Sequence, residues 1–129
     1  MTDPLPPVSL RPLLDTDSAR VLELNSAAVP AVNDLGADDL AALIAASHSA
    51  IAVVADADPD TVLGFAILFA AGADYASENY RYFSEQAHTF LYLDRIVVAA
   101  DHRGRGLGAQ LYSAVFDAAR ALPTEVVFC

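Results

Sequence analysis

The sequence predicts one mixed α/β domain, in which a largely antiparallel sheet is flanked by helices. Three observations predict this class. The chain has 129 residues, which fits a single domain spanning residues 1–129. Hydrophobic residues make up 55% of the chain, which is enough to build a substantial core. Segments with the apolar periodicity of strands and of helices follow in the order strand, two helices, three strands, helix, strand.

The first third of the chain predicts a strand followed by two helices. Residues 8–11 form a short strand, which Pro12 ends or confines to a sheet edge. Asp15 or Thr16 can cap a helix that runs to about residue 28. A second helix covers residues 36–47, because its leucines and isoleucine recur at helical spacing.

The middle of the chain predicts a hairpin and then a third long strand. Residues 50–55 and 61–70 are apolar strands, and residues 56–60 have the composition of a turn. The second strand is almost continuously hydrophobic, so we expect it to be buried on both faces. Residues 71–86 are polar and aromatic and predict a loop or a short helix. The third long strand covers residues 90–98.

The last part of the chain predicts a helix over residues 105–122 and a strand over residues 124–129. The sequence stops inside this apolar strand, whereas the last residues of a domain are normally exposed and polar. We therefore expect a fold that is incomplete at its C-terminus and continues beyond Cys129. An open edge at the final strand also suggests pairing with another chain, for example in a homodimer.

Composition excludes several classes of function. The formal net charge is −10, and all seven basic residues are arginines, so a general role in binding nucleic acid or an anionic membrane is disfavoured. No apolar run is long enough to span a bilayer, and the N-terminus lacks the pattern of a signal peptide. A single cysteine fits a reducing cytoplasm. The three scattered histidines have no metal-ligand spacing, so we expect no metal site.

The most informative segment is an Arg/Gly turn between the third long strand and the last helix. Glycines that open a helix leave backbone N–H groups pointing outward at the positive end of the helix dipole. Such a site suits a phosphate, and neighbouring arginines add charge-assisted contacts to it. The turn and the start of the helix comprise Arg103, Gly104, Arg105, Gly106, Leu107, Gly108 and Ala109. This chemistry predicts a cofactor that carries a diphosphate.

The same turn resembles the acetyl-CoA-binding signature of the GCN5-related N-acetyltransferases. Arg103, Gly106 and Gly108 fill that signature, and Val98 stands where the family has a valine. The resemblance implies that the backbone of Ile96, Val97 and Val98 pairs with the pantetheine arm. It also implies that the amides from Gly104 to Ala109 hold the pyrophosphate. The family continues with a further helix and two strands, which commonly carry a tyrosine that protonates the departing thiolate.

The resemblance implies an enzyme that transfers an acetyl group from acetyl-CoA to a primary amine, on a small molecule or a peptide N-terminus. Catalysis would depend chiefly on positioning the amine against the thioester. The alternative is a non-catalytic acyl-CoA-binding or interaction module of the same fold.

Asp94 is the candidate catalytic base. Strand alternation predicts that its side chain shares a face with Ile96 and Val98, close to the thioester that the resemblance implies. A carboxylate there could relay a proton from the attacking ammonium. The alternative is a structural salt bridge or hydrogen bond with a neighbour such as an arginine.

The segment before the third strand offers candidates for the acceptor pocket. Asn79, Tyr80 and Tyr82 could line it, or they could belong to an exposed aromatic loop. Glu78 and Glu85 could bind a cationic acceptor, or they could simply be charges on the surface of a helix.

Overall fold

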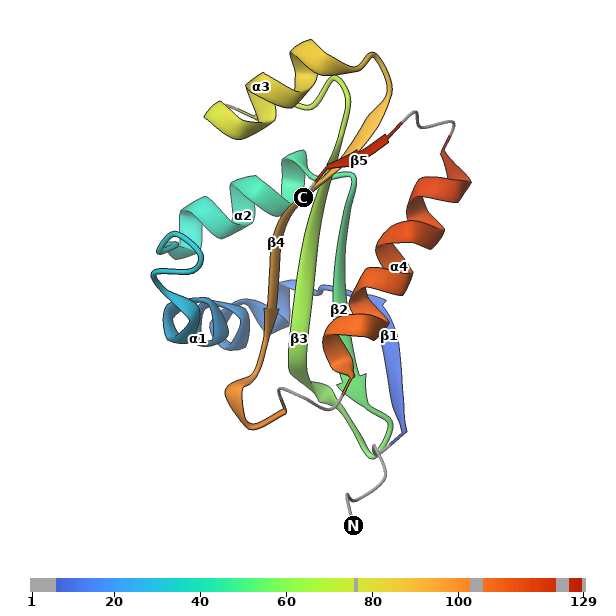
Figure 1. The fold of residues 1–129 in the computed structure, drawn as a ribbon. Helices are drawn as coiled ribbons and strands as arrows, with labels where there is room; N and C mark the ends of the chain where they lie inside the picture. The colour runs from blue at the N-terminus through green and yellow to red at the C-terminus, as the bar shows by residue number, and fades with distance from the viewer. Residues whose placement is uncertain (1–6, 76, 103–105, 123–125, 129) are drawn as a thin grey trace.

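The computed structural model describes residues 7–75, 77–102, 106–122 and 126–128. Five strands form one sheet in the order β1-β2-β3-β4-β5 (Figure 1). The first four strands pair antiparallel, and β5 pairs parallel to β4. The largely antiparallel mixed sheet predicted from the sequence is confirmed. The strands are β1 (Val8–Pro12), β2 (Ser49–Ala55), β3 (Asp58–Ala70), β4 (Phe90–Val98) and β5 (Val126–Phe128).

Helices cover both faces of this sheet. Figure 1 shows α1 and α2 on one face, α4 on the other, and α3 at the end of the sheet where β3 leads into β4. The helices are α1 (Ser18–Ala28), α2 (Ala37–Ala46), α3 (Glu78–Gln86) and α4 (Leu107–Ala121), with short 3-10 turns at Asp15–Asp17 and Ala100–His102. The segment expected to be a loop or short helix is therefore a helix.

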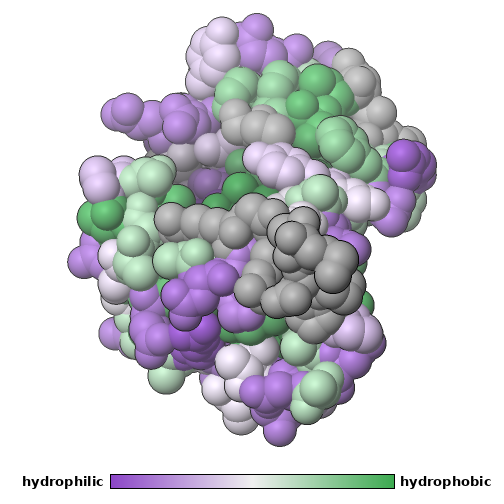
Figure 2. All heavy atoms as spheres, turned by 60° about the horizontal axis from the view of Figure 1, so that its bottom comes forward, coloured by the Kyte–Doolittle hydropathy of each residue, from purple (hydrophilic) through white to green (hydrophobic). Residues whose placement is uncertain are grey.

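The core lies in two clusters, one on each face of the sheet. Phe65, Ile67 and Phe69 of β3 pack toward α1, α2 and α3. Leu63, Ala66 and Leu68 pack toward α4 with Leu111. This alternation buries β3 on both faces, as its continuous hydrophobicity predicts. Figure 2 turns the lower end of the molecule toward the viewer, and hydrophilic and hydrophobic residues are interspersed over its described surface.

Several element boundaries differ from the sequence-based expectation by one to three residues, and the structure explains the shifts at β3 and α1. β3 begins at Asp58 rather than residue 61, because register shifts in β2 allow Ala55 to pair with Asp58. The helix after β1 begins at Ser18, preceded by a 3-10 turn. Asp17 makes no side-chain cap to α1, because its carboxylate accepts two hydrogen bonds from Arg11, at 2.7 and 2.9 Å, and one from the N–H of Leu14.

Because Gly64 has no side chain, β3 can lie close to β2 and β4 at this position. A Cβ at this position would lie 2.9 Å from the carbonyl oxygen of Val97 and 3.1 Å from Cγ1 of Val53. The first contact is with backbone, which cannot move aside as a flexible side chain can. The absence of a side chain at Gly64 therefore keeps the second half of β4 in register with β3.

Candidate functional site

A β-bulge in β4 determines where Asp94 points. Ile67 of β3 pairs with Arg95, but the next residue, Leu68, pairs with Leu93, so Asp94 is an extra residue in β4. A bulge of this kind re-aims side chains and reverses the alternation beyond it. The expectation that Asp94 shares a face with Ile96 and Val98 is therefore wrong.

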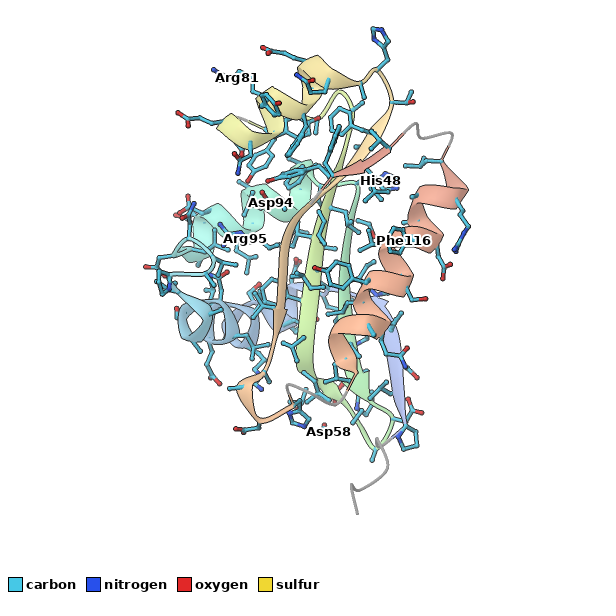
Figure 3. The ribbon with its side chains drawn as sticks, in the orientation of Figure 1. His48, Asp58, Arg81, Asp94, Arg95 and Phe116 are labelled. Carbon is cyan, nitrogen blue, oxygen red and sulfur yellow. The ribbon has the colours of Figure 1, made fainter. Side chains whose placement is uncertain are left out.

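Because of the bulge, the two faces of β4 present different side chains. Leu91 and Leu93 before the bulge, and Ile96 and Val98 after it, pack against the cluster around α4. Asp94 lies on the opposite side, where α1 and α2 cover the sheet, and Figure 3 shows it beside Arg95 there. Simple alternation cannot predict this arrangement, because it counts every residue of a strand as paired.

The carboxylate of Asp94 is buried and only partly hydrogen-bonded. Its side chain is 8% exposed. Oδ1 accepts a hydrogen bond of 2.8 Å from the hydroxyl of Tyr75, whereas Oδ2 has no hydrogen-bond partner among the described residues. Burial raises the pKa of Asp94, although Tyr75 and Arg95 oppose the shift. A carboxylate with a raised pKa and an oxygen that makes no hydrogen bond is suited to accept a proton.

Tyr75 is held in place as a hydrogen-bond donor to Asp94. Its ring stacks on Phe69 with centroids 4.1 Å apart. Burial and the nearby Asp94 carboxylate raise the pKa of Tyr75 well above its ordinary value. The hydroxyl therefore remains protonated at neutral pH and donates to the carboxylate throughout the usual assay range.

Arg95 joins Asp94 to the connection between α1 and α2. Its side chain is 10% exposed, and its Nε lies 3.6 Å from Oδ2 of Asp94. Its Nη1 donates to Oδ1 of Asn25 at 2.9 Å and to the carbonyl oxygen of Asn33 at 2.8 Å. Asn25 in turn donates from Nδ2 to the same carbonyl at 3.0 Å. The structural alternative for Asp94, an arginine partner, is thus present, but it leaves Oδ2 without a hydrogen bond.

Two adjoining cavities open beside this cluster. A smaller one of about 260 Å³ contains Asp94 and Arg95, and a larger one of about 650 Å³ lies toward α2 and α3. Both are lined by Asn33, Tyr75, Ser77 and Asn79, so the two cavities lie next to each other along these residues. The smaller cavity reaches the carboxylate, and the larger one has a volume typical of small-molecule sites.

The predicted acceptor residues have different positions relative to these cavities. Asn79 lines both. Tyr80 is 4% exposed, and its hydroxyl donates to the carbonyl of Ala70 at 2.6 Å and accepts from the N–H of Ala73 at 3.0 Å, so it supports the β3–α3 connection. Tyr82 is 58% exposed and lines neither cavity.

Of the two glutamates, Glu78 lines the larger cavity, whereas Glu85 is exposed elsewhere on α3. The sequence reasoning missed Asn33, Tyr75 and Arg95. The α1–α2 connection, the approach to α3 and β4 bring these three together, and their spacing along the chain gave no signal of this.

The start of α4 is the described part of the segment predicted to bind phosphate. Gly106 has φ = 81°, and an added Cβ at Gly106 or Gly108 would meet no atom within 4 Å. The first N–H groups of a helix have no partner within it, and here they begin at Leu107 beside this open space. Arg103, Gly104 and Arg105 lie outside the described residues, whereas Leu107 is buried and Ala109 is exposed.

The pairing between β4 and β5 is short. In the described part of the chain it joins Phe90–Tyr92 to Val126–Phe128. The predicted cofactor-binding residues Ile96, Val97 and Val98 lie farther along β4, on its way to the start of α4 (Figure 1). A strand that extends beyond its parallel neighbour can pair with an extended ligand arm.

The part of the chain that the structure describes contains no cluster of three metal-ligating side chains of the kinds His, Cys, Asp and Glu. None of its helices has the length and apolar character needed to cross a membrane.

The sequence matches the model of the acetyltransferase (GNAT) family over residues 19–129. No curated protein sequence matches it. Among solved structures, an acetyltransferase from Trypanosoma brucei is similar with a TM-score of 0.67 and 21% identity, covering 95% of this chain and 81% of that one. Arabidopsis thaliana NAA60 in complex with acetyl-CoA gives a TM-score of 0.71 and 17% identity, over 94% and 74% of the two chains.

A ribosomal-protein-alanine N-acetyltransferase from Brucella melitensis is also similar, with a TM-score of 0.67 and 19% identity, over 94% of this chain and 77% of that one. These identities show a shared fold.

Proposed function

The chain belongs to the acetyltransferase (GNAT) family, and on that premise we propose that it transfers an acetyl group from acetyl-CoA to a primary amine. The observation that carries the proposal is the buried Asp94 carboxylate, which lines the smaller of two adjoining cavities and whose Oδ2 makes no hydrogen bond to a described residue. A base buried beside an acceptor-sized cavity is what amine acetylation requires, because only the neutral amine is a nucleophile.

The donor site combines the start of α4 with the second half of β4. The open space at Gly106 and Gly108 fits a pyrophosphate against the first amides of α4, because a side chain there would occupy the cradle. Arg103, Gly104 and Arg105, which lie outside the described residues, belong to the predicted cradle, and the backbone of Ile96–Val98 would pair with the pantetheine arm. When bound, acetyl-CoA supplies an acetyl group activated as a thioester.

Asp94 acts in this proposal as the general base. It takes one proton from the ammonium of the acceptor, whose nitrogen then forms a bond to the acetyl carbon as the bond from that carbon to sulfur breaks. The nitrogen then loses its second proton, and the sulfur would leave as a thiolate that takes up one proton, so the ammonium's two lost protons end on Asp94 and on the thiol. The raised pKa of Asp94 brings its basicity closer to neutral pH, where transfer is most efficient.

Two neighbours position the base. Tyr75 donates a hydrogen bond to Oδ1 and so fixes the orientation of the carboxylate, whose Oδ2 makes no hydrogen bond to a described residue. Arg95 provides a compensating charge from one side and fixes the α1–α2 connection through Asn33. We assign both as positioning residues, because their contacts act through Asp94 and the cavity wall.

The test measures CoA binding by calorimetry and release of free thiol from acetyl-CoA with a panel of primary amines. We expect micromolar to millimolar CoA affinity and amine-dependent thiol release. Asp94→Asn is expected to lower kcat about 10²-fold or more while leaving CoA affinity unchanged. The matched control is Asp117→Asn, which removes an exposed carboxylate from α4.

The outcomes distinguish the acetyltransferase from the alternative functions. Absence of CoA binding contradicts the proposal outright. Binding without thiol release for any amine favours the acyl-CoA-binding module over the enzyme.

A further inference from the structure

We propose that Tyr75 relays a proton from the acceptor amine to Asp94, so that it is a catalytic residue as well as one that positions the carboxylate. The inference deepens the proposed function and rests on it, since it names the group through which the same base acts. The amine nitrogen contacts the Tyr75 hydroxyl, and Asp94 receives the proton through that hydroxyl.

The two oxygens of the Asp94 carboxylate differ in their surroundings. Oδ2 is buried and lies 3.6 Å from Nε of Arg95. Oδ1 accepts the hydrogen bond of 2.8 Å from the hydroxyl of Tyr75. Because the Asp94 side chain as a whole is 8% exposed, the Tyr75 hydroxyl offers a hydrogen-bonded route to a carboxylate that is otherwise enclosed.

Tyr75 also extends from the carboxylate to the larger cavity. The described lining of that cavity includes Tyr75 but not Asp94, whereas both residues line the smaller cavity. An amine in the larger cavity, which has a volume typical of small-molecule sites, therefore has Tyr75 in its wall. Tyr75 thus combines a place beside the acceptor with a hydrogen bond to the base.

Aromatic neighbours hold the ring of Tyr75 in one place. The ring stacks on the buried Phe69, with centroids 4.1 Å apart and an interplanar angle of 13°. The ring of Tyr80 packs beside it at a centroid distance of 5.6 Å, and the Tyr80 hydroxyl is itself bound to the backbone at Ala70 and Ala73. A relay requires such fixed geometry, because a proton moves between groups that are within hydrogen-bond reach.

The relay moves two protons and leaves the tyrosine unchanged. One N–H bond of the acceptor ammonium breaks, and its proton passes to the phenolic oxygen of Tyr75. The O–H proton of Tyr75 passes to Oδ1 of Asp94, which becomes a neutral carboxylic acid, and the neutral amine then attacks the acetyl carbon. The two transfers are concerted, because burial and the nearby carboxylate raise the pKa of Tyr75 well above its ordinary value and so disfavour a free phenolate.

The experiment compares Tyr75→Phe with the wild-type chain on two acceptors. Ethylamine is an ammonium ion at neutral pH, whereas 2,2,2-trifluoroethylamine is largely neutral there, and thiol release from acetyl-CoA gives the rate for each. For ethylamine we expect Tyr75→Phe to lower kcat about 10²-fold or more, as Asp94→Asn does. For 2,2,2-trifluoroethylamine the loss should be less than about tenfold, because a neutral amine needs no deprotonation before it attacks.

Solvent isotope effects distinguish the relay from a purely positioning role. Single-turnover rates with ethylamine are measured in mixtures of H2O and D2O, where one moving proton gives a linear dependence on the deuterium fraction and two give a curved one. We expect a curved dependence for the wild-type chain and a linear one for Tyr75→Phe. A hydroxyl that only positioned Asp94 would give a linear dependence in both.

Tyr112→Phe is the matched control, because it removes an exposed hydroxyl from α4 outside both cavities. Tyr75→Phe keeps the ring that stacks on Phe69, and melting temperatures and CoA affinity identify any loss of folding. The isotope measurement on the wild-type chain needs no variant, so it can refute the relay even if Tyr75→Phe unfolds.

Failure of the relay can be told apart from failure of the proposed function. A linear dependence for the wild-type chain overturns the relay, and so does a kcat of Tyr75→Phe within about threefold of the wild-type value for ethylamine. In both cases acetyl transfer itself stands. If no amine is acetylated, the proposed function and the relay are contradicted together.

Discussion

Replacing Arg95 with methionine removes the charge that joins β4 to the α1–α2 connection. Arg95 is 9% exposed, and Nη1 makes two hydrogen bonds, to Asn25 and to the carbonyl of Asn33. Each hydrogen bond of a charged group contributes about 1.5–3 kcal/mol. Breaking a buried ion pair costs about 3–5 kcal/mol, and the 3.6 Å separation from Asp94 places this pair at the weak end.

We therefore expect Arg95→Met to lower the free energy of unfolding by about 3 kcal/mol, a large part of the 5–15 kcal/mol of an ordinary domain. Urea unfolding followed by circular dichroism at neutral pH measures it. The double variant Asp94→Asn/Arg95→Met should regain about 1 kcal/mol or more, because it also removes the unpaired carboxylate.

Arg81→Met is the control for this prediction, since Arg81 is exposed on α3 and its loss should change stability by less than about 0.5 kcal/mol. A loss below about 1 kcal/mol for Arg95→Met would refute the claim that this guanidinium holds the α1–α2 connection. A double variant less stable than Arg95→Met would refute the claim that the remaining carboxylate carries the penalty.

Gly64→Ala should destabilise the chain by about 1–3 kcal/mol in the same urea assay, because the new Cβ would lie 2.9 Å from the carbonyl of Val97; an unchanged midpoint would contradict this packing. Gly106→Ala should cost about 1–2 kcal/mol, because its φ of 81° is left-handed, and it should weaken CoA binding measured by calorimetry. Hydrogen bonds from Arg11 lower the pKa of Asp17, so this pair stabilises the fold above the unfolded-state pKa, and the gain is lost as pH falls through the lowered folded-state pKa. Asp17→Asn should therefore destabilise at neutral pH, and a stability difference that does not shrink in acid would count against the pairing.

The sequence predicts the sheet well because its strands are marked by local signals. The bounds of β4 agree with the apolar run over residues 90–98, and β3 is buried on both faces as its composition indicates. Helix α2 follows its leucine spacing closely. Boundaries are predicted less well where tertiary contacts decide: residues 15–17, where Asp15 or Thr16 was expected to cap the helix, form a 3-10 turn whose Asp17 pairs with Arg11, and α1 begins at Ser18.

The candidate site is harder to predict from the sequence than the sheet is. The charge of Asp94 within an apolar strand marks it as a candidate. The face that its side chain occupies depends on a β-bulge, which strand alternation does not predict. Asn33 and Tyr75 reach it from distant segments, and no local pattern marks them. Tyr82 is close to Asn79 in the sequence, and both are exposed, yet only Asn79 lines the cavities.

The central claim, that Asp94 is the base of an acetyl transfer, is tested most directly by the pH dependence of kcat/KM for an acetylated amine. Because burial raises the pKa of Asp94, activity should fall as pH drops through a value above that of an ordinary aspartate. Asp94→Asn should lose this acidic limb together with about 10²-fold or more of the rate. A variant that keeps both the wild-type rate and the same acidic limb would contradict the account.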